Sequence, residues 1–340
     1  MIDAPPFKPF LFLRSGRAQT LVAQYIPGQS RPYQAKRHIV DLPDGDKIVL
    51  HDDCPAEWKP GERATLLLHG VTGCHGSPYL VRIAGKLNDA GVRTFRMDMR
   101  GCGAGMKLAQ HPGHAGRSED ARAAVEAIHE LCPRSPCTII GFSLGGNIAL
   151  KMLGESGSQP PANLDSGIAI APPIDLVCCG ENIERGFNRV FSRNFASALV
   201  RFVQDRREFM PGLANIQLAP APRGIVDFDD RVTAPLSGFD GVWDYYRQCS
   251  ALPRLNEIGI PTLIITSHDD PVIPFEMFER AELSPTTTLL ATPQGGHVGY
   301  YAARGPDPDR WWLDWRIIEW IRAQDRSNSK TVASAARRRL

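Results

Sequence analysis

Short, almost purely apolar runs recur along the chain and alternate with longer segments in which apolar residues follow helical spacing. Apolar runs of this length that stop at turn residues are typical of central strands buried on both faces of a sheet. The turn Pro43-Asp44-Gly45 separates two of the runs and predicts a β-hairpin. The pattern predicts strands at 39–40, 47–50, 65–68, 92–97, 137–140, 167–171, 262–266 and 287–291, and helices at 77–90, 147–153 and 309–323.

The alternation of strands and helices predicts an α/β fold, with a mostly parallel central sheet of about eight strands and helices on both faces. Residues 174–260 interrupt it, because they carry helical patches and no clear strand over a length far beyond an ordinary connection. We interpret them as a helical cap inserted between two late strands. The predicted organisation is an irregular N-terminal arm at 1–33, the α/β core at 34–173 and 261–324, the helical cap at 174–260, and a disordered basic tail at 325–340.

The composition is that of an ordinary globular enzyme, with 340 residues of which 43% are hydrophobic and 22% charged. The net charge of +2 is too small to indicate nucleic acid as a partner. A signal peptide is not recognisable, and no run approaches the roughly 20 apolar residues that span a bilayer. We therefore expect a soluble, cytoplasmic protein without an integral membrane segment, of unknown oligomeric state. The eight cysteines are scattered, which predicts free thiols rather than a disulfide framework or a metal site.

The most informative motif is Gly141-x-Ser143-x-Gly145, which follows the predicted strand at 137–140 and opens a helix. A nucleophile on such a sharp strand-to-helix turn needs glycine two residues to either side, because a Cβ there would collide with neighbouring backbone. The turn lifts the side chain above the carboxyl end of the sheet, where ligands bind in open α/β folds. The bare pattern also arises by chance, so its position between strand and helix carries the prediction that Ser143 is a nucleophile.

A serine hydroxyl needs a neighbouring base to become a good nucleophile. Enzymes with this turn carry their triad in the order Ser, Asp or Glu, His. His297 lies in a glycine-flanked loop after the last predicted strand, and is the candidate general base. Asp269 and Asp270 follow the preceding strand. We favour Asp270 as the acid that orients the histidine, because Asp-x-x-Ile-Pro matches the acid turn of many such enzymes, and Asp269 may be read instead as a turn cap.

The backbone N–H groups of Val71 and Leu144 are the candidate oxyanion donors, since one should follow the nucleophile and the other should come from the loop after the strand at 65–68. The glycine-rich loop 101–105 lacks the spacing of a dinucleotide cradle. We expect no cofactor and no metal, because Cys74-His75 and Cys178-Cys179 lack ligand spacing. His111 and His114 have no evident partner and are interpreted as solvated.

Several stretches of the sequence resemble the YheT-like branch of the α/β-hydrolase superfamily. They span most of residues 60–300, and those between the nucleophile and acid motifs are more specific than the nucleophile motif itself. The matching stretches are 67–73, 77–79, 100–103, 141–147, 228–235, 238–239, 244–246, 269–274 and 295–300. The resemblance implies a Ser-Asp-His triad on the positions already chosen, and esterase-type activity on acyl or lipid-like esters.

The sequence thus predicts a serine hydrolase that cleaves carboxylic esters through an acyl-enzyme on Ser143, His297 and Asp270. An acyltransferase or a thioesterase would use the same residues. A binding protein that kept the fold and lost catalysis is the alternative from another class, because fold alone does not decide function. The physiological substrate, a small-molecule or lipid-like ester, depends on the predicted cap, whose pocket is not readable from the sequence.

Overall fold

The computed structural model describes residues 4–22, 25–26, 32–161 and 163–337. Its centre is one eight-stranded sheet with the strand order β1-β2-β4-β3-β5-β6-β7-β8. Strand β2 pairs antiparallel with both β1 and β4, and the remaining neighbours pair in parallel. The strands are β1 (Lys36–Asp41), β2 (Lys47–Asp53), β3 (Ala64–Leu68), β4 (Arg93–Asp98), β5 (Cys137–Phe142), β6 (Leu164–Ile170), β7 (Thr262–Ser267) and β8 (Thr287–Thr292). The predicted mostly parallel sheet of about eight strands is confirmed.

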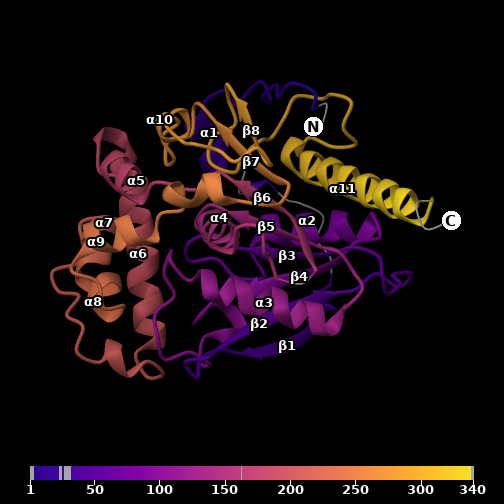
Figure 1. Ribbon diagram of the computed structural model, residues 1–340. Coiled ribbons are helices and arrows are strands. Elements are labelled where there is room, and N and C mark those ends of the chain that lie inside the picture. The colour runs from indigo at the N-terminus through magenta and orange to yellow at the C-terminus, as the bar shows by residue number, and fades with distance from the viewer. Residues whose placement is uncertain (1–3, 23–24, 27–31, 162, 338–340) are drawn as a thin grey trace.

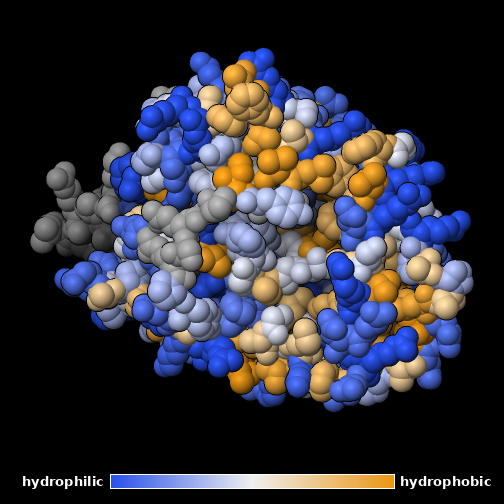
Figure 2. All heavy atoms as spheres, turned by 180° about the vertical axis from the view of Figure 1, so that it is seen from behind, coloured by the Kyte–Doolittle hydropathy of each residue, from blue (hydrophilic) through white to orange (hydrophobic). Residues whose placement is uncertain are grey.

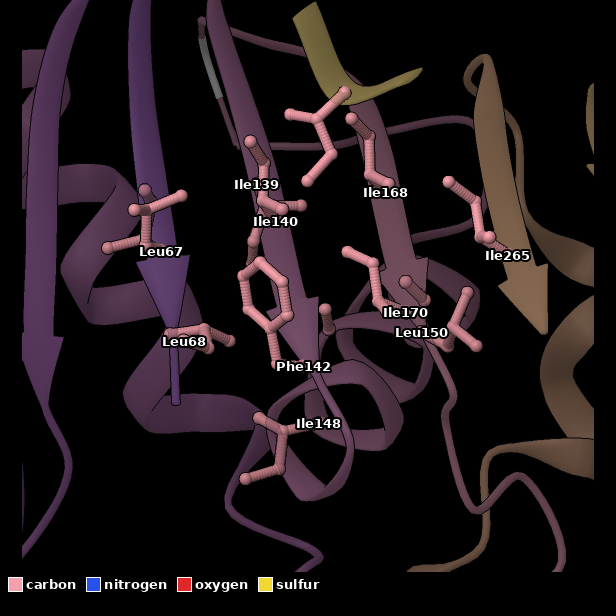
Figure 3. Packing of buried hydrophobic residues seen from close by; sticks show 14 of the residues in the cluster. Leu67, Leu68, Ile139, Ile140, Phe142, Ile148, Leu150, Ile168, Ile170 and Ile265 are labelled. Carbon is pink, nitrogen blue, oxygen red and sulfur yellow. The ribbon is translucent and has the colours of Figure 1, made fainter. Parts of the chain in front are cut away.

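Helices cover both faces of this sheet (Figure 1). Helix α3 packs against α4, and α2 contacts α11. The helices of the core are α2 (Pro78–Asp89), α3 (Ser118–Leu131), α4 (Leu144–Ser156), α10 (Glu276–Glu279) and α11 (Trp312–Arg337), with the short helix η2 at Gly103–Gly105. Because helices lie on both sides, every residue of β3, β5 and β7 is buried. Figure 3 shows the packed aliphatic side chains of these strands, among them Leu67, Ile140 and Ile265.

The segment between β6 and β7 consists of helices and loops without a strand, and lies to one side of the sheet (Figure 1). A small hydrophobic cluster of its own, which includes Ala196, Val203 and Phe228, holds part of it together. Its elements are α5 (Leu176–Ile183), η3 (Gly186–Asn188), α6 (Arg189–Arg206), η4 (Pro211–Leu213), α7 (Ile225–Phe228), the π-helix η5 (Asp229–Thr233), α8 (Ala234–Leu236), α9 (Val242–Cys249) and η6 (Leu252–Glu257). The division of the chain into core and cap domains itself stays a prediction.

Both ends of the chain carry more regular structure than the sequence predicted. The arm at 1–33 contains the helix α1 (Gly16–Val22), and Phe7 packs edge-on against Tyr300 and Trp312. At the other end α11 continues to Arg337, past residue 325, where the sequence predicted a disordered tail. The alanine and arginine residues there have high helix propensity and extend a helix already nucleated by packing. The disordered tail, like the other domain bounds, stays a prediction. Residues 338–340 lie outside the described residues.

Within the described ranges, no helix combines the length and apolar character needed to cross a membrane.

Candidate active site

Ser143 occupies a strained turn between β5 and α4. Its φ of 51° and ψ of −119° lie outside the regions that L-residues normally adopt. A Cβ on Gly141 would stand 2.2 Å from the carbonyl oxygen of Gly145, and one on Gly145 would stand 2.6 Å from that of His69. Both glycines are therefore required, as the motif predicted. The strain is held by neighbouring structure, since the Ser143 N–H donates to Ile170 O and the Ser143 carbonyl accepts from Gly146.

His297 reaches Ser143 from the loop after the edge strand β8, which lies three strands from β5 in the sheet. Its Nε2 lies 2.9 Å from Ser143 Oγ, and its Nδ1 lies 2.9 Å from Asp270 Oδ2. A carboxylate only accepts hydrogen bonds, so Nδ1 carries the proton, and Nε2 is left to accept from the serine hydroxyl. The structure therefore joins three residues that are 154 and 27 positions apart in one relay of two hydrogen bonds.

The two aspartates before His297 have different partners. Asp270 Oδ1 accepts from the N–H groups of Val272 and Ile273, which leaves Oδ2 to face the imidazole. Asp269 makes no contact with the ring, and its Oδ1 accepts from the Gly296 N–H. Asp270, whose side chain is fully buried, thus caps its own turn and also holds His297, whereas Asp269 was the expected turn cap. Asp269 instead anchors the loop that carries the histidine.

The N-terminal segment fixes the histidine loop from outside the core. Thr20 Oγ1 accepts from the His297 N–H at 2.9 Å. The fully buried Gln19 accepts from the Tyr301 N–H and donates to the carbonyls of Leu13 and Tyr301. Gly296 packs tightly on this segment, because a Cβ there would stand 2.3 Å from Gly16 O. No sequence pattern indicated this contact, since Thr20 and His297 are 277 positions apart.

The candidate oxyanion donors flank the serine. Gly70 packs so closely on Ser143 that an added Cβ would stand 3.4 Å from the serine Cβ, which places the following residue, Val71, beside the nucleophile. The Gly70 N–H itself donates to the buried Tyr79 hydroxyl. Burial raises the pKa of Tyr79 to about 12, so this hydroxyl stays protonated. Within the described residues, neither the Val71 nor the Leu144 N–H donates a hydrogen bond.

Ser143 lies where two cavities meet. The entrance cavity, of ≈ 2050 Å³, is lined by Ser143 and His297 together with residues of α1, α2 and α6. The inner cavity, of ≈ 790 Å³, lies between the sheet and the helical segment and is lined by Ser143 and mainly apolar side chains, including Leu144, Leu176, Ile183, Leu199 and Val272. The hydroxyl therefore borders both cavities, of which the inner one has the more apolar lining.

His114 is part of this inner cavity, so the prediction that it is solvated is wrong. Its ring makes edge contacts with Phe239 and Tyr245 and faces the thiol of Cys249. Burial lowers the pKa of His114 to about 3, and nearby cationic side chains act in the same direction. The imidazole is therefore neutral at ordinary pH and belongs to the wall. His111 is half exposed and its Nδ1 contacts Asp46.

Stretches that carry the sequence resemblance, among them 141–147, 228–235 and 244–246, form hydrogen bonds around the inner cavity. Asp229 accepts hydrogen bonds from the hydroxyls of Thr233 and Tyr246. Burial raises the pKa of Asp229 to about 6, although these two hydrogen bonds act to lower it. Asn147, fully buried, ties the loop at Ala115 to the end of α9 through Cys249. The motifs thus brace the cavity walls, a role that their spacing alone did not indicate.

Two clusters of potential metal ligands occur within the described ranges, one of Asp44, Asp46 and His111 and one close to β2 and β4 of His51, His75 and Asp98. In the second cluster the geometry argues against an ion. The two imidazoles stack with centroids 3.5 Å apart and 12° between their planes. An ion bound to a ring nitrogen lies near the plane of that ring, and two parallel planes this far apart cannot both contain it. Burial alone would raise the pKa of Asp98, but hydrogen bonds from both rings outweigh it and lower the pKa. The cluster is arranged as a hydrogen-bond network.

Comparison with known proteins places these features in a family. A profile described as the alpha/beta hydrolase fold matches residues 65–303. The chain is 34% identical over 291 residues to YheT of Escherichia coli (strain K12), whose name proposes an esterase, with 83% of each chain covered. It is 28% identical over 302 residues to phospholipase ABHD3 of Homo sapiens, covering 86% of this chain and 73% of that protein. The solved structure of Est1E from Butyrivibrio proteoclasticus shares the fold, with a TM-score of 0.54 at 16% identity, covering 86% of this chain and all (100%) of that one.

Proposed function

The chain belongs to the α/β hydrolase family, and on that premise we propose that it is a serine hydrolase that cleaves carboxylic esters through an acyl-enzyme. The observation that carries the proposal is the relay from Asp270 through His297 to Ser143, with 2.9 Å at both steps, at the junction of two cavities. The esterase and phospholipase names of the similar proteins point in the same direction. A protein that had lost catalysis would not need to keep this relay or the strain at Ser143.

The proposed reaction proceeds in two halves. Ser143 Oγ attacks the ester carbonyl while its proton passes to His297 Nε2, and Asp270 stabilises the imidazolium that forms. The N–H groups of Val71 and Leu144 donate to the oxyanion of the tetrahedral intermediate. Collapse of this intermediate expels the alcohol, which takes the proton from His297. Water then attacks the acyl-enzyme by the same steps and releases the carboxylic acid.

We assign the two ends of the ester to the two cavities. The inner cavity is mainly apolar, so burial of a hydrocarbon acyl chain there removes apolar surface from water. The entrance cavity is wider and carries polar side chains such as Asn194 and Arg201, which suits the alcohol part and its release. Transfer of the acyl group to another alcohol or a thiol would use the same residues, and product analysis with competing acceptors separates it from hydrolysis.

A fluorophosphonate probe and a panel of p-nitrophenyl esters of increasing acyl length test the proposal. We expect stoichiometric labelling, with the modified peptide containing Ser143, and hydrolysis of the esters without added metal or cofactor. Ser197 also lines the entrance cavity, so Ser197→Ala is the matched control and should label like the wild type. Wild-type protein that neither labels at Ser143 nor hydrolyses any ester of the panel would contradict the proposal.

We expect Thr20 to act as a positioning residue for His297. Thr20→Val removes the acceptor for the His297 N–H while nearly preserving shape, and a hydrogen bond of ordinary strength predicts a roughly two- to tenfold loss of kcat with little change in KM. Thr20→Ser keeps the hydroxyl and should restore most of the rate. Equal losses in both variants, or no loss in either, would show that the hydroxyl does not position the loop. Steady-state kinetics on one soluble ester decides this.

A further inference from the structure

Exposed hydrophobic side chains are concentrated in two short segments, residues 8–22 and 185–201. Among the described residues ten large hydrophobic side chains are exposed, and five of them lie in these segments. Of the five, Phe12 has the largest exposed fraction, 78%, and that of Phe187 is 50%. Figure 2 shows hydrophobic side chains gathered over the upper part of the molecule, where Figure 1 places α1, with hydrophilic ones around them. The five are Leu11, Phe12, Val22, Phe187 and Val190.

The charged residues of both segments are all positive. The segments contain no Asp or Glu, in a chain whose 39 basic and 37 acidic residues otherwise nearly balance. All of these basic side chains are exposed. Arg185 is partly neutralised by Glu181, but no ion pair joins any of the other six to a described residue. The basic residues are Lys8, Arg14, Arg17, Arg185, Arg189, Arg193 and Arg201.

The two segments meet around the opening that leads to Ser143. The Arg17 guanidinium lies 4.6 Å from the centre of the Phe187 ring, which joins the segments directly. The entrance cavity is lined by Thr20 and Leu21 from the first segment and by Asn194 and Arg201 from the second. We call the exposed hydrophobic and basic side chains of both segments the rim surface. Both of its segments border the entrance cavity, which leads to Ser143.

We propose that the rim surface binds the surface of an anionic lipid bilayer and so presents the entrance cavity to esters dissolved in it. Apolar side chains that enter the acyl boundary, together with Lys and Arg that attract acidic headgroups, are the two elements of interfacial binding. Protruding apolar side chains interspersed with basic ones suit a deformable lipid surface better than the close-packed core of a protein interface. The consequence for substrate choice rests on the proposed function, whereas the binding itself does not.

Co-sedimentation with vesicles tests the binding without turnover, using the Ser143→Ala protein. We expect at least about tenfold tighter binding to phosphatidylcholine vesicles that contain about a third phosphatidylglycerol than to phosphatidylcholine alone. The preference should weaken between about 0.05 M and about 0.5 M salt, because screening shortens the reach of the basic side chains. Binding that is absent, or the same for both vesicles, would overturn the proposal.

Matched variants locate the surface. Phe12→Ser with Phe187→Ser, and separately Arg17→Glu with Arg193→Glu, should each lower vesicle binding at least about fivefold. Ile39→Ser on the edge strand β1 and Arg134→Glu after α3 remove an equally exposed apolar group and a basic group elsewhere, and should bind like the parent. Thermal melts verify that each variant is folded. Equal losses in rim and control variants would overturn the assignment of the rim surface, while labelling of wild-type Ser143 reports on the proposed function independently.

Discussion

Replacement of Ser143 by alanine is expected to lower kcat for ester hydrolysis by a factor on the order of 10⁴ to 10⁶, with little change in KM. The substitution removes the only atom that the relay from His297 contacts on the nucleophile, Oγ at 2.9 Å from Nε2. Substrate binding in the two cavities does not depend on that atom, so the loss falls on the chemical step. Single-turnover and steady-state kinetics with a chromogenic ester measure it.

His297→Ala is expected to lower kcat about as much as Ser143→Ala does. The double variant is expected to lose no more kcat than either single variant. Residues that act as one unit lose their effect together, so the free-energy costs do not add. The activity that survives should come from the oxyanion donors and substrate binding alone. A Ser143→Ala protein that retained a tenth of the wild-type kcat would rule out Ser143 as the nucleophile.

Asp270→Asn is expected to lower kcat by a factor on the order of 10⁴. An asparagine can accept from Val272 and Ile273 with its carbonyl oxygen, so the turn should keep its shape. Its amide group then faces His297 Nδ1 as a donor, and the ring must adopt the tautomer in which Nε2 carries the proton. That nitrogen can no longer accept the proton of Ser143.

Asp269→Asn is the matched control, one residue away in the same turn. Its carbonyl oxygen can still accept from the Gly296 N–H, so we expect the loss of kcat to stay below about tenfold. Kinetics of the two variants on the same ester, with thermal melts to verify folding, gives the comparison. If Asp269→Asn lost more kcat than Asp270→Asn, the orienting carboxylate would be Asp269 and the assignment to Asp270 would be wrong.

The parts of the fold that the sequence predicted well are those that local physics determines. The runs 65–68 and 137–140 are strands because purely apolar runs of that length fit the interior of a sheet covered on both faces, and β3 and β5 lie there. The turn at Ser143 is recognisable within a few residues, since a Cβ on Gly141 would collide with Gly145 and Gly146 of the same turn. The need for glycine at position 145 comes from the neighbouring strand, because a Cβ there would collide with Leu68 and His69.

The choice between Asp269 and Asp270 shows where that local information ends. Both follow β7 in a turn whose sequence permits either to cap it, and the pattern favoured Asp270 only by likeness to other enzymes. In the folded chain Asp270 uses one oxygen for the turn and the other for His297, while Asp269 bonds Gly296. The two roles depend on the position of the loop after β8, which no residue of the turn encodes.

The sequence by itself determined the succession of strands and helices along the chain, the sharp turn at Ser143, and His297 with two adjacent aspartates as candidates for the relay, because each is written in periodicity or in a few consecutive residues. Only the tertiary structure decided that Thr20 holds the His297 loop from 277 positions away, that His114 lies neutral in the cavity wall, and that two basic, apolar segments meet around the entrance. These features arise when distant segments pack together, and a sequence pattern carries no measure of which distant segments become neighbours.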